Sequence, residues 1–189
     1  MNWTKAVSAD YTPILCVNEH IRKYHLGFSP IQIPIEKKDE HDTAYDMKYI
    51  QVIHKGGITV DNLKQYLKNL ILEYDDSNDV NYFTINNNKA VLRKSARLGL
   101  MNSLAIQEQD GKDKYTLWLE TDNGLKDYTL LITDIRNMLK QLEIYAIECN
   151  NVTQLHLSNL DNLLTKEDVL NYNIIQGYPE HLVFNTNIE

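Results

Sequence analysis

The sequence is poor in the residues and runs that identify several classes of protein. Its two cysteines, Cys16 and Cys149, lie too far apart to define a disulfide framework or a zinc-binding pattern. No apolar run approaches the roughly 18 residues that a transmembrane helix requires. The first ten residues lack the apolar core of a secretory signal peptide. We therefore expect a cytoplasmic protein, or a virion protein if a phage encodes it, with no membrane contact, no metal and no other cofactor.

Basic residues are also in the minority. The chain contains 19 Lys and Arg against 26 Asp and Glu, which gives a formal net charge of -7. A protein that binds nucleic acid over its whole surface has the opposite balance, so the composition argues against a nucleic-acid partner.

Glycine is scarce as well, and the pair Gly56-Gly57 fits neither common phosphate-binding loop. We interpret that pair as a tight connector between two elements.

Asparagine is the residue that the chain has in excess. It accounts for 20 of the 189 residues, and it occurs together with abundant Ile, Lys and Tyr, which are all encoded by A/T-rich codons. This bias indicates a low-GC bacterium, or one of its phages or mobile elements. The hydrophobic content of 43% and the charged content of 24% are ordinary for a globular protein. The length fits one domain with an appended arm.

The first 48 residues differ in composition from the rest, and we interpret residues 1–48 as an N-terminal arm or irregular lobe. They contain three of the four prolines. Residues 17–26 predict a short helix that Gly27 ends. Residues 31–35 predict an edge strand because proline interrupts them, and residues 36–48 are charged enough for a solvated connector.

Residues 49–189 predict the globular domain, and the pattern of its first half is clear. Residues 49–54 predict a strand. From Val60 apolar residues recur at helical spacing, with Thr59 or Asp61 placed to cap the helix. The apolar stripe of this helix consists of Leu63, Tyr66, Leu67, Leu70, Ile71 and Tyr74. Beyond an acidic loop, the segments 82–85 and 90–92 predict a hairpin with an asparagine turn between them.

The second half predicts further hairpins and helices. Residues 100–107 and 115–121 pair in our interpretation around Asp110-Gly111-Lys112, and Asp122-Asn123-Gly124 marks another turn. A helix follows with Leu130, Leu131, Ile135, Met138, Leu139 and Leu142 on one face. Residues 143–148 fit either a continuation of that helix or a strand. Residues 155–158 predict a short strand, and Thr165 with Asp168 resembles a capping box. The fold class that follows is α+β, with a mainly antiparallel sheet packed by two or three helices.

Four cations concentrate in one short stretch. Lys89, Arg93, Lys94 and Arg97 give residues 88–98 a charge of +4 without an acidic residue, so the rest of the chain carries -11. If the stretch is helical, three of the cations share one face; if it is a strand followed by a loop, they scatter. We expect exposed side chains that bind phosphates or an acidic partner.

Two histidine triplets support an alternative. His41-Asp42-Thr43 and His156-Leu157-Ser158 both match the His-x-[Ser/Thr] pattern typical of two-histidine phosphoesterases. In such enzymes two strands aim both imidazoles at a phosphate, with one acting as base and the other as acid. Under this alternative His41, Thr43, His156 and Ser158 would cleave a phosphodiester in a nucleotide.

Our first hypothesis for function is a non-enzymatic interaction or assembly protein. No specific catalytic or cofactor motif occurs, and twelve tyrosines favour protein interfaces. The contexts that fit are a phage structural or connector component, an inhibitor, or an immunity-type binder. Its partner would be another protein or a second copy of itself, bound through the N-terminal arm and through the cations at 89, 93, 94 and 97.

Overall fold

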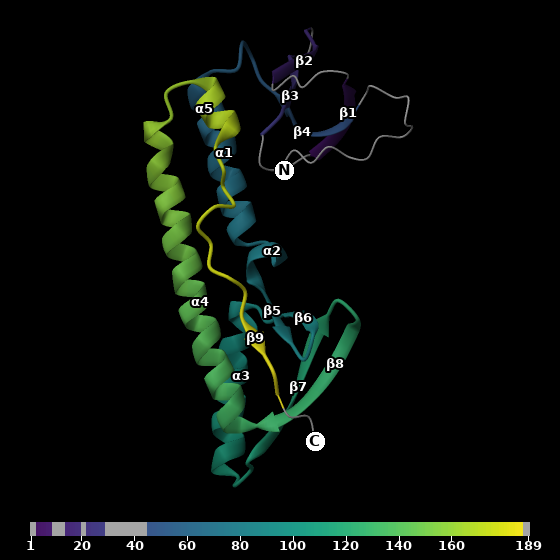
Figure 1. Ribbon diagram of the computed structural model, residues 1–189, viewed down its shortest axis with the longest axis vertical. Helices are drawn as coiled ribbons and strands as arrows, with labels where there is room; N and C mark the ends of the chain where they lie inside the picture. The colour runs from purple at the N-terminus through teal and green to yellow at the C-terminus, as the bar shows by residue number, and fades with distance from the viewer. Residues whose placement is uncertain (1–2, 9–13, 20–21, 29–44, 187–189) are drawn as a thin grey trace. The chain divides into compact units, whose positions relative to one another are not determined.

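The computed structural model describes residues 3–8, 14–19, 22–28 and 45–186. They form two compact units, each assembled from two stretches of sequence (Figure 1). Unit 1 comprises Met1–Leu72 and Leu155–Gln176, and unit 2 comprises Glu73–Gln154 and Gly177–Glu189. The division predicted at residue 48 stays a prediction, although strand β4 (Tyr45–Ile53) runs across that residue.

Unit 1 contains a four-stranded antiparallel sheet of order β1-β4-β3-β2. Its strands are β1 (Trp3–Ser8), β2 (Ile14–Asn18), β3 (Lys23–Leu26) and β4. The strand predicted at residues 49–54 is therefore confirmed as the second part of β4. The helix predicted over residues 17–26 is wrong, since β2 and β3 form a hairpin there. Arg22, directly before β3, adopts a φ of 51°, a left-handed conformation.

Helix α1 (Val60–Asp75) confirms the apolar stripe. Leu63, Leu67, Leu70 and Ile71 are buried, as the helical spacing requires. Thr59 caps the helix: its Oγ1 accepts from the amide of Asn62 at 3.2 Å, while its own amide donates to Asn62 Oδ1 at 3.1 Å. This reciprocal pair satisfies amides that a helix start leaves without intrahelical partners.

The second stretch of unit 1 ends in short helical turns. A 3-10 turn, η2 (Leu160–Asn162), precedes helix α5 (Lys166–Asn171). The predicted capping box is confirmed, because Thr165 Oγ1 accepts from the amide of Asp168 and the Asp168 carboxylate accepts from the amide of Thr165. These hydrogen bonds hold the pKa of the Asp168 carboxyl below its ordinary value.

Unit 2 is built from two successive hairpin-and-helix segments on one sheet. Its strands and helices are α2 (Asn78–Asn81), β5 (Tyr82–Ile85), β6 (Asn88–Val91), α3 (Lys94–Gln109), β7 (Lys114–Thr121), β8 (Gly124–Leu131), α4 (Ile132–Asn159) and β9 (Val183–Phe184). The sheet has the order β8-β7-β6-β5-β9, and all its pairings are antiparallel except that of β5 with β9. The α+β fold class with a mainly antiparallel sheet is therefore confirmed.

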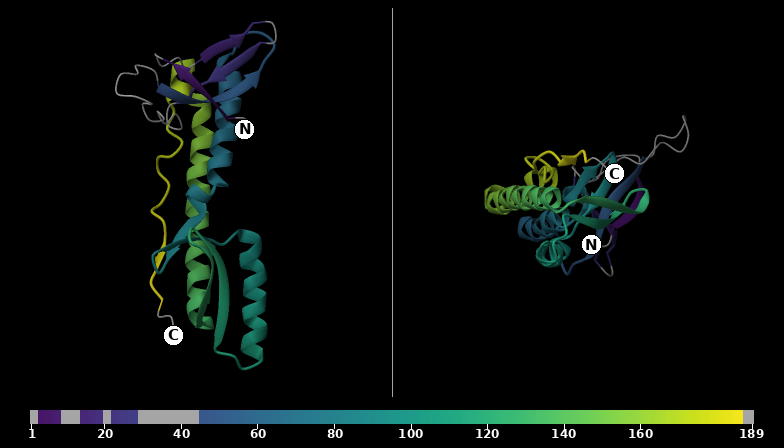
Figure 2. Two further views of the ribbon diagram at one scale, coloured as in Figure 1. Left: turned by 90° about the vertical axis from the view of Figure 1, so that its right-hand side faces the viewer. Right: turned by 90° about the horizontal axis from the view of Figure 1, so that it is seen from below.

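The two predicted turns of this sheet are present. Asn86 and Asn87, with φ values of 47° and 63°, join β5 to β6, and asparagine tolerates this conformation better than most residues. Asp122 and Asn123 join β7 to β8, and Gly124 has a φ of 92°. The long curved β7–β8 hairpin runs beside α3 (Figure 2).

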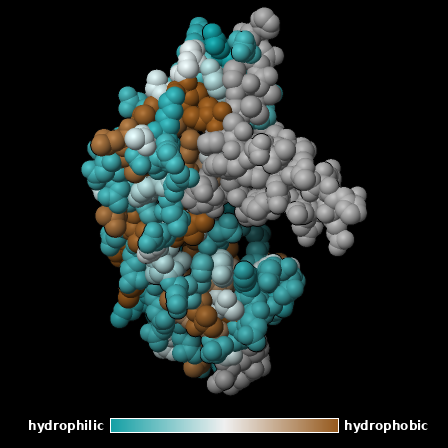
Figure 3. Space-filling view, turned by 45° about the horizontal axis from the view of Figure 1, so that its top comes forward, coloured by the Kyte–Doolittle hydropathy of each residue, from teal (hydrophilic) through white to brown (hydrophobic). Residues whose placement is uncertain are grey.

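One face of the sheet carries the core of unit 2. Inward side chains of the strands pack with Leu100 and Leu104 of α3 and with Ile135, Met138, Leu139 and Leu142 of α4 in a single apolar cluster. Both helices therefore cover the same face, while the alternate residues of the strands point outward. On the surface drawn in Figure 3, apolar patches lie between hydrophilic ones.

The hairpin predicted around Asp110-Gly111-Lys112 is wrong, because residues 100–107 belong to α3. The turn residues instead end that helix: the amide of Lys112 donates to Gln107 O at 2.9 Å and the amide of Gly111 to Glu108 O at 3.0 Å. Gly111 has a φ of 74°. This pair of bonds is the Schellman ending of a helix, which favours glycine at that position.

Helix α4 corrects two further predictions. It begins at Ile132, so Leu130 and Leu131 lie in β8 instead of on the helix. It then continues through residues 143–148 and through 155–158, where we had predicted a strand. Within the described ranges, no helix is both long and apolar enough to span a membrane.

Candidate functional site

The four predicted binding cations lie around the start of α3, but on different elements. Lys89 is in β6, Arg93 immediately precedes α3, and Lys94 and Arg97 are in its first turns. The segment is therefore neither one helix nor one strand with a loop. Lys89, Arg93 and Lys94 are exposed. The expectation of exposure is wrong for Arg97, which is buried with 8% of its surface accessible.

Arg97 is buried because it lies between the two helices. Its Nε is 2.9 Å from Glu143 Oε1 of α4, and the exposed fractions of the two side chains are 10% and 44%. The distance makes this an ion pair, although the Arg97 Nε–H lacks a hydrogen bond of acceptable geometry. Because the charge is desolvated and paired, Arg97 is part of the folded interior instead of a free cation.

A cavity of about 600 Å³ opens at the start of α3. Arg93, Lys94, Ser95 and Arg97 supply one part of its lining, and Asp75, Asp76, Asn78 and Asn81 supply another. Glu143 and Ile147 contribute from α4. The structure therefore brings three of the four predicted cations to one concave site, together with carboxylates and amides that the sequence analysis did not connect with them.

A second hollow, of about 500 Å³, lies between β6, β7 and the start of α3. Lys89 and Arg93 line it together with Trp118 and Glu120 of β7. Trp118 points away from the core, since its neighbours Leu117 and Leu119 are buried, and 59% of its surface is exposed. Trp118 is not among the predicted binding residues, although its place between two leucines in an alternating strand indicates an outward side chain.

Lys89 is held against an aromatic stack at the edge of this hollow. Its Nζ lies 4.4 Å from the centre of the Tyr82 ring. Tyr82 in turn stacks on His181, with ring centres 3.7 Å apart. His181 Nε2 is 2.8 Å from the carbonyl oxygen of Asp79 and therefore donates to it. The cation–π contact positions the ammonium group without neutralising it.

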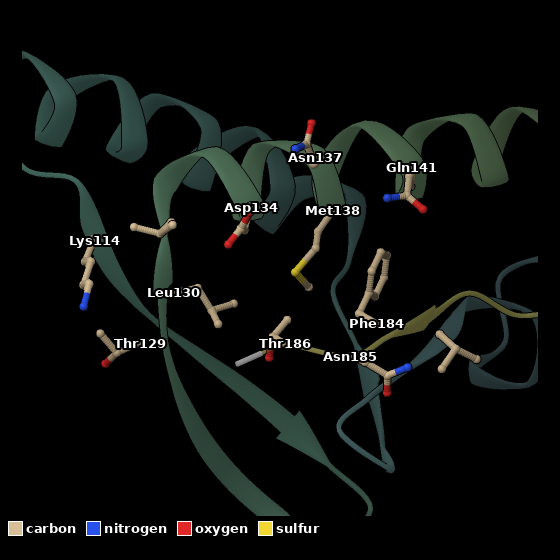
Figure 4. A pocket seen from close by; sticks show the side chains of 12 residues that line it. Lys114, Thr129, Leu130, Asp134, Asn137, Met138, Gln141, Phe184, Asn185 and Thr186 are labelled. Carbon is tan, nitrogen blue, oxygen red and sulfur yellow. The ribbon is translucent and has the colours of Figure 1, made fainter. Parts of the chain in front are cut away.

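A third cavity, of about 460 Å³, lies between β8, α4 and the segment that follows β9 (Figure 4). Leu130, Met138 and Phe184 give it an apolar side, and Asp134, Asn137, Gln141 and Thr186 give it a polar side. Both outer strands of the sheet, β8 and β9, contribute to it. Its lining combines one lysine and one aspartate with neutral groups, so it favours no particular charge.

Cys149 lines the first cavity and lies among aromatic side chains. It is buried, and it packs with Val80 and Tyr145, whose hydroxyl donates to Val80 O at 2.7 Å. Burial raises the pKa of the Cys149 thiol and the pKa of the Tyr145 hydroxyl. The thiol is therefore protonated near neutral pH and is a packing residue instead of a nucleophile.

His156 of the alternative site is in α4 and is buried. Its Nε2 is 2.9 Å from Gln176 O, so that nitrogen carries the proton, and its Nδ1 is 2.9 Å from the Tyr172 hydroxyl, which donates to it. Ser158 donates to Leu155 O at 2.8 Å. His41 and Thr43 lie outside the described residues, so convergence of the two triplets stays a prediction. The phosphoesterase alternative requires His156 to lie in a strand with its imidazole open to a phosphate. His156 instead lies in a helix, and both of its imidazole nitrogens are within hydrogen-bonding distance of protein atoms.

Comparisons with family models, with curated proteins and with solved structures found no match for this chain. The functional inference therefore depends on the geometry of the site. In the described part of the chain, no cluster of three or more His, Cys, Asp or Glu side chains has an arrangement that could hold a metal ion.

Proposed function

We propose that this chain is a non-enzymatic assembly protein that binds a further copy of itself through a docking surface. The docking surface consists of Lys89, Arg93, Lys94 and Trp118. The observation that carries the proposal is the hollow between β6, β7 and the start of α3, which an exposed tryptophan lines together with two cations. Tryptophan and arginine are the residues that most often dominate the binding energy of protein interfaces.

The charge distribution supports a second copy as the partner. Residues 88–98 carry +4, and the rest of the chain carries -11, so each copy presents acidic surface to the basic surface of another. Opposite potentials of this kind steer two molecules together and fix their orientation. Because the basic and acidic surfaces differ, the contact is heterologous and builds rings or longer chains instead of closing after two copies.

Trp118 supplies the apolar part of the interaction. A tryptophan buries about 150–250 Å² in an interface, and 59% of the Trp118 surface is available for this. Burial of that area contributes about 2–4 kcal/mol. Trp118→Ala should therefore weaken self-association by about thirtyfold or more, while folding is little affected because the side chain lies outside the core.

The experiment is charge reversal with a matched control. Arg93→Glu/Lys94→Glu should abolish self-association in analytical ultracentrifugation at about 0.1 M salt, where charges interact over about 10 Å. Lys112→Glu/Lys140→Glu changes the net charge equally at exposed positions that line neither hollow, and it should assemble normally. Equal losses in both variants would mean that net charge controls association, and the docking surface would then be wrong.

A further inference from the structure

Two ion pairs join α3 to α4, and they differ in a way that concerns the cavity at the start of α3. Arg136 is hydrogen-bonded through Nε and Nη2 to both carboxylate oxygens of Glu108, at the surface. Arg97 is nine-tenths buried, yet among the described residues its one ion-pair contact is with Glu143. The buried arginine is thus the less satisfied of the two.

The remaining donors of Arg97 have no partner among the described residues. A guanidinium offers five N–H donors, and Arg97 uses none of them in a hydrogen bond within the described part of the chain. Its Nε–H is buried against Glu143, whereas its terminal nitrogens are not fully buried and remain open to the cavity. Since Arg97 lines the cavity, a group bound there is the partner that its terminal nitrogens lack.

The start of α3 presents further donors to the same cavity. Its N-cap residue, Arg93, makes no side-chain capping bond, and the first turn contains no acidic residue. The amides of Ser95 and Ala96 thus lack the capping oxygen that usually satisfies them. Arg93 and Lys94 add positive charge where the helix dipole is already positive, an arrangement that a bound anion would stabilise.

From these observations we infer that the cavity at the start of α3 binds the oxyanion group, phosphate or carboxylate, of a small ligand. Two oxygens of the anion would accept from the terminal nitrogens of Arg97, since the fork of a guanidinium matches both groups. Another oxygen would accept from the amide of Ser95, which lines the cavity. Arg93 and Lys94 would contribute charge from the rim.

The other part of the lining indicates what the rest of the ligand carries. Asp75 and Asp76 are acceptors, and Asn78 and Asn81 supply amide groups. Asp75 Oδ1 already accepts from Thr153 at 2.7 Å, which fixes that carboxylate in place. Carboxylates repel a second anion but accept hydrogen bonds from hydroxyl or amino groups. At about 600 Å³ the cavity exceeds the size of a free phosphate, so a ligand with one anionic group and such donors fits both parts.

The test is an NMR titration with inorganic phosphate at constant ionic strength, with sodium chloride as the compensating salt. The wild-type protein should show saturable shifts at the amide of Ser95 and at Arg97 Nε–H. A parallel titration with acetate distinguishes the two anions: saturation by acetate instead of phosphate identifies a carboxylate site. Shifts that rise without saturation with both anions would overturn the inference, and this result needs no variant.

Arg97→Lys gives the specificity of the site. Lysine keeps the charge opposite Glu143 but loses the fork, so phosphate should bind about tenfold more weakly. The matched control is Arg136→Gln, which breaks the other pair between the same helices outside the cavity and should leave phosphate binding unchanged. Equal weakening in both variants would indicate a general effect on the helix pair and would contradict the inference.

The anion site does not depend on the proposed assembly. Trp118 is the apolar anchor of the docking surface and does not line this cavity. Trp118→Ala should therefore bind phosphate normally while it self-associates more weakly. A wild-type protein that assembles but gives no saturable phosphate shift would refute the anion site alone.

Discussion

Replacing Arg97 by glutamate should destabilise the fold far more than the same change at Arg93. At position 97 the new carboxylate would be buried and would face Glu143, whose oxygen is now 2.9 Å from Arg97 Nε. Two like charges at about 4 Å repel by about 4 kcal/mol at the effective dielectric of a protein surface. Because the Glu143 side chain is 44% exposed, water screens part of this repulsion, and we expect about 3 kcal/mol of destabilisation.

Urea unfolding followed by circular dichroism measures the effect. With a slope of about 2 kcal/mol per molar urea, a loss of 3 kcal/mol lowers the midpoint by about 1.5 M. Arg93→Glu is the control, and it should change the free energy of unfolding by about 0.5 kcal/mol or less because Arg93 is exposed. The double variant Arg97→Glu/Glu143→Arg should recover part of the loss. Equal midpoints for the two single variants would refute the burial and pairing of Arg97.

Three further predictions concern stability. Leu67→Ala in α1 should cost about 2–5 kcal/mol in urea unfolding, and an unchanged midpoint would exclude this side chain from the core. Gly111→Ala should lower the free energy of unfolding by about 1 kcal/mol because Gly111 has a φ of 74°. Gly99→Ala should raise it by about 0.5–1 kcal/mol, because Gly99 is inside α3 and nothing lies within 4 Å of the added carbon. Changes of the opposite sign would contradict the assigned conformations. Burial lowers the pKa of His25 and of His156, so the folded state favours their neutral forms. The melting temperature should therefore fall as the pH drops below about 6.5, and these two histidines should have no effect on it at higher pH. His156→Gln should flatten that dependence, and an unaltered slope would mean that His156 does not contribute.

Local signals in the sequence predicted the elements whose chemistry is complete within a few residues. The Asn86-Asn87 turn is one case, since asparagine accepts positive φ and strands flank it on both sides. The capping box at Thr165 is another, because both of its hydrogen bonds join residues three positions apart. The stripe of α1 was equally clear, with apolar residues on one face over four turns.

Where the same local pattern serves two structures, prediction from the sequence failed. Asp110-Gly111-Lys112 suits a hairpin turn, but its glycine ends α3. The helical signal of α3 is weak because Gly99 and Asn102 have low helix propensity. The alternation of Leu155 and Leu157 resembled a strand because a short apolar run cannot distinguish the two periods. The burial of Arg97 was also beyond reach, since its partner Glu143 is 46 positions away and no local signal connects them.

The mass of the wild-type particle in solution tests the proposed assembly most directly. Size-exclusion chromatography with light scattering should give a multiple of 22.0 kDa at about 0.1 M salt. At about 1 M salt, where charges interact over only about 3 Å, the mass should fall toward that of one chain. A mass of 22.0 kDa at both salt concentrations and at every protein concentration would contradict self-assembly through the docking surface.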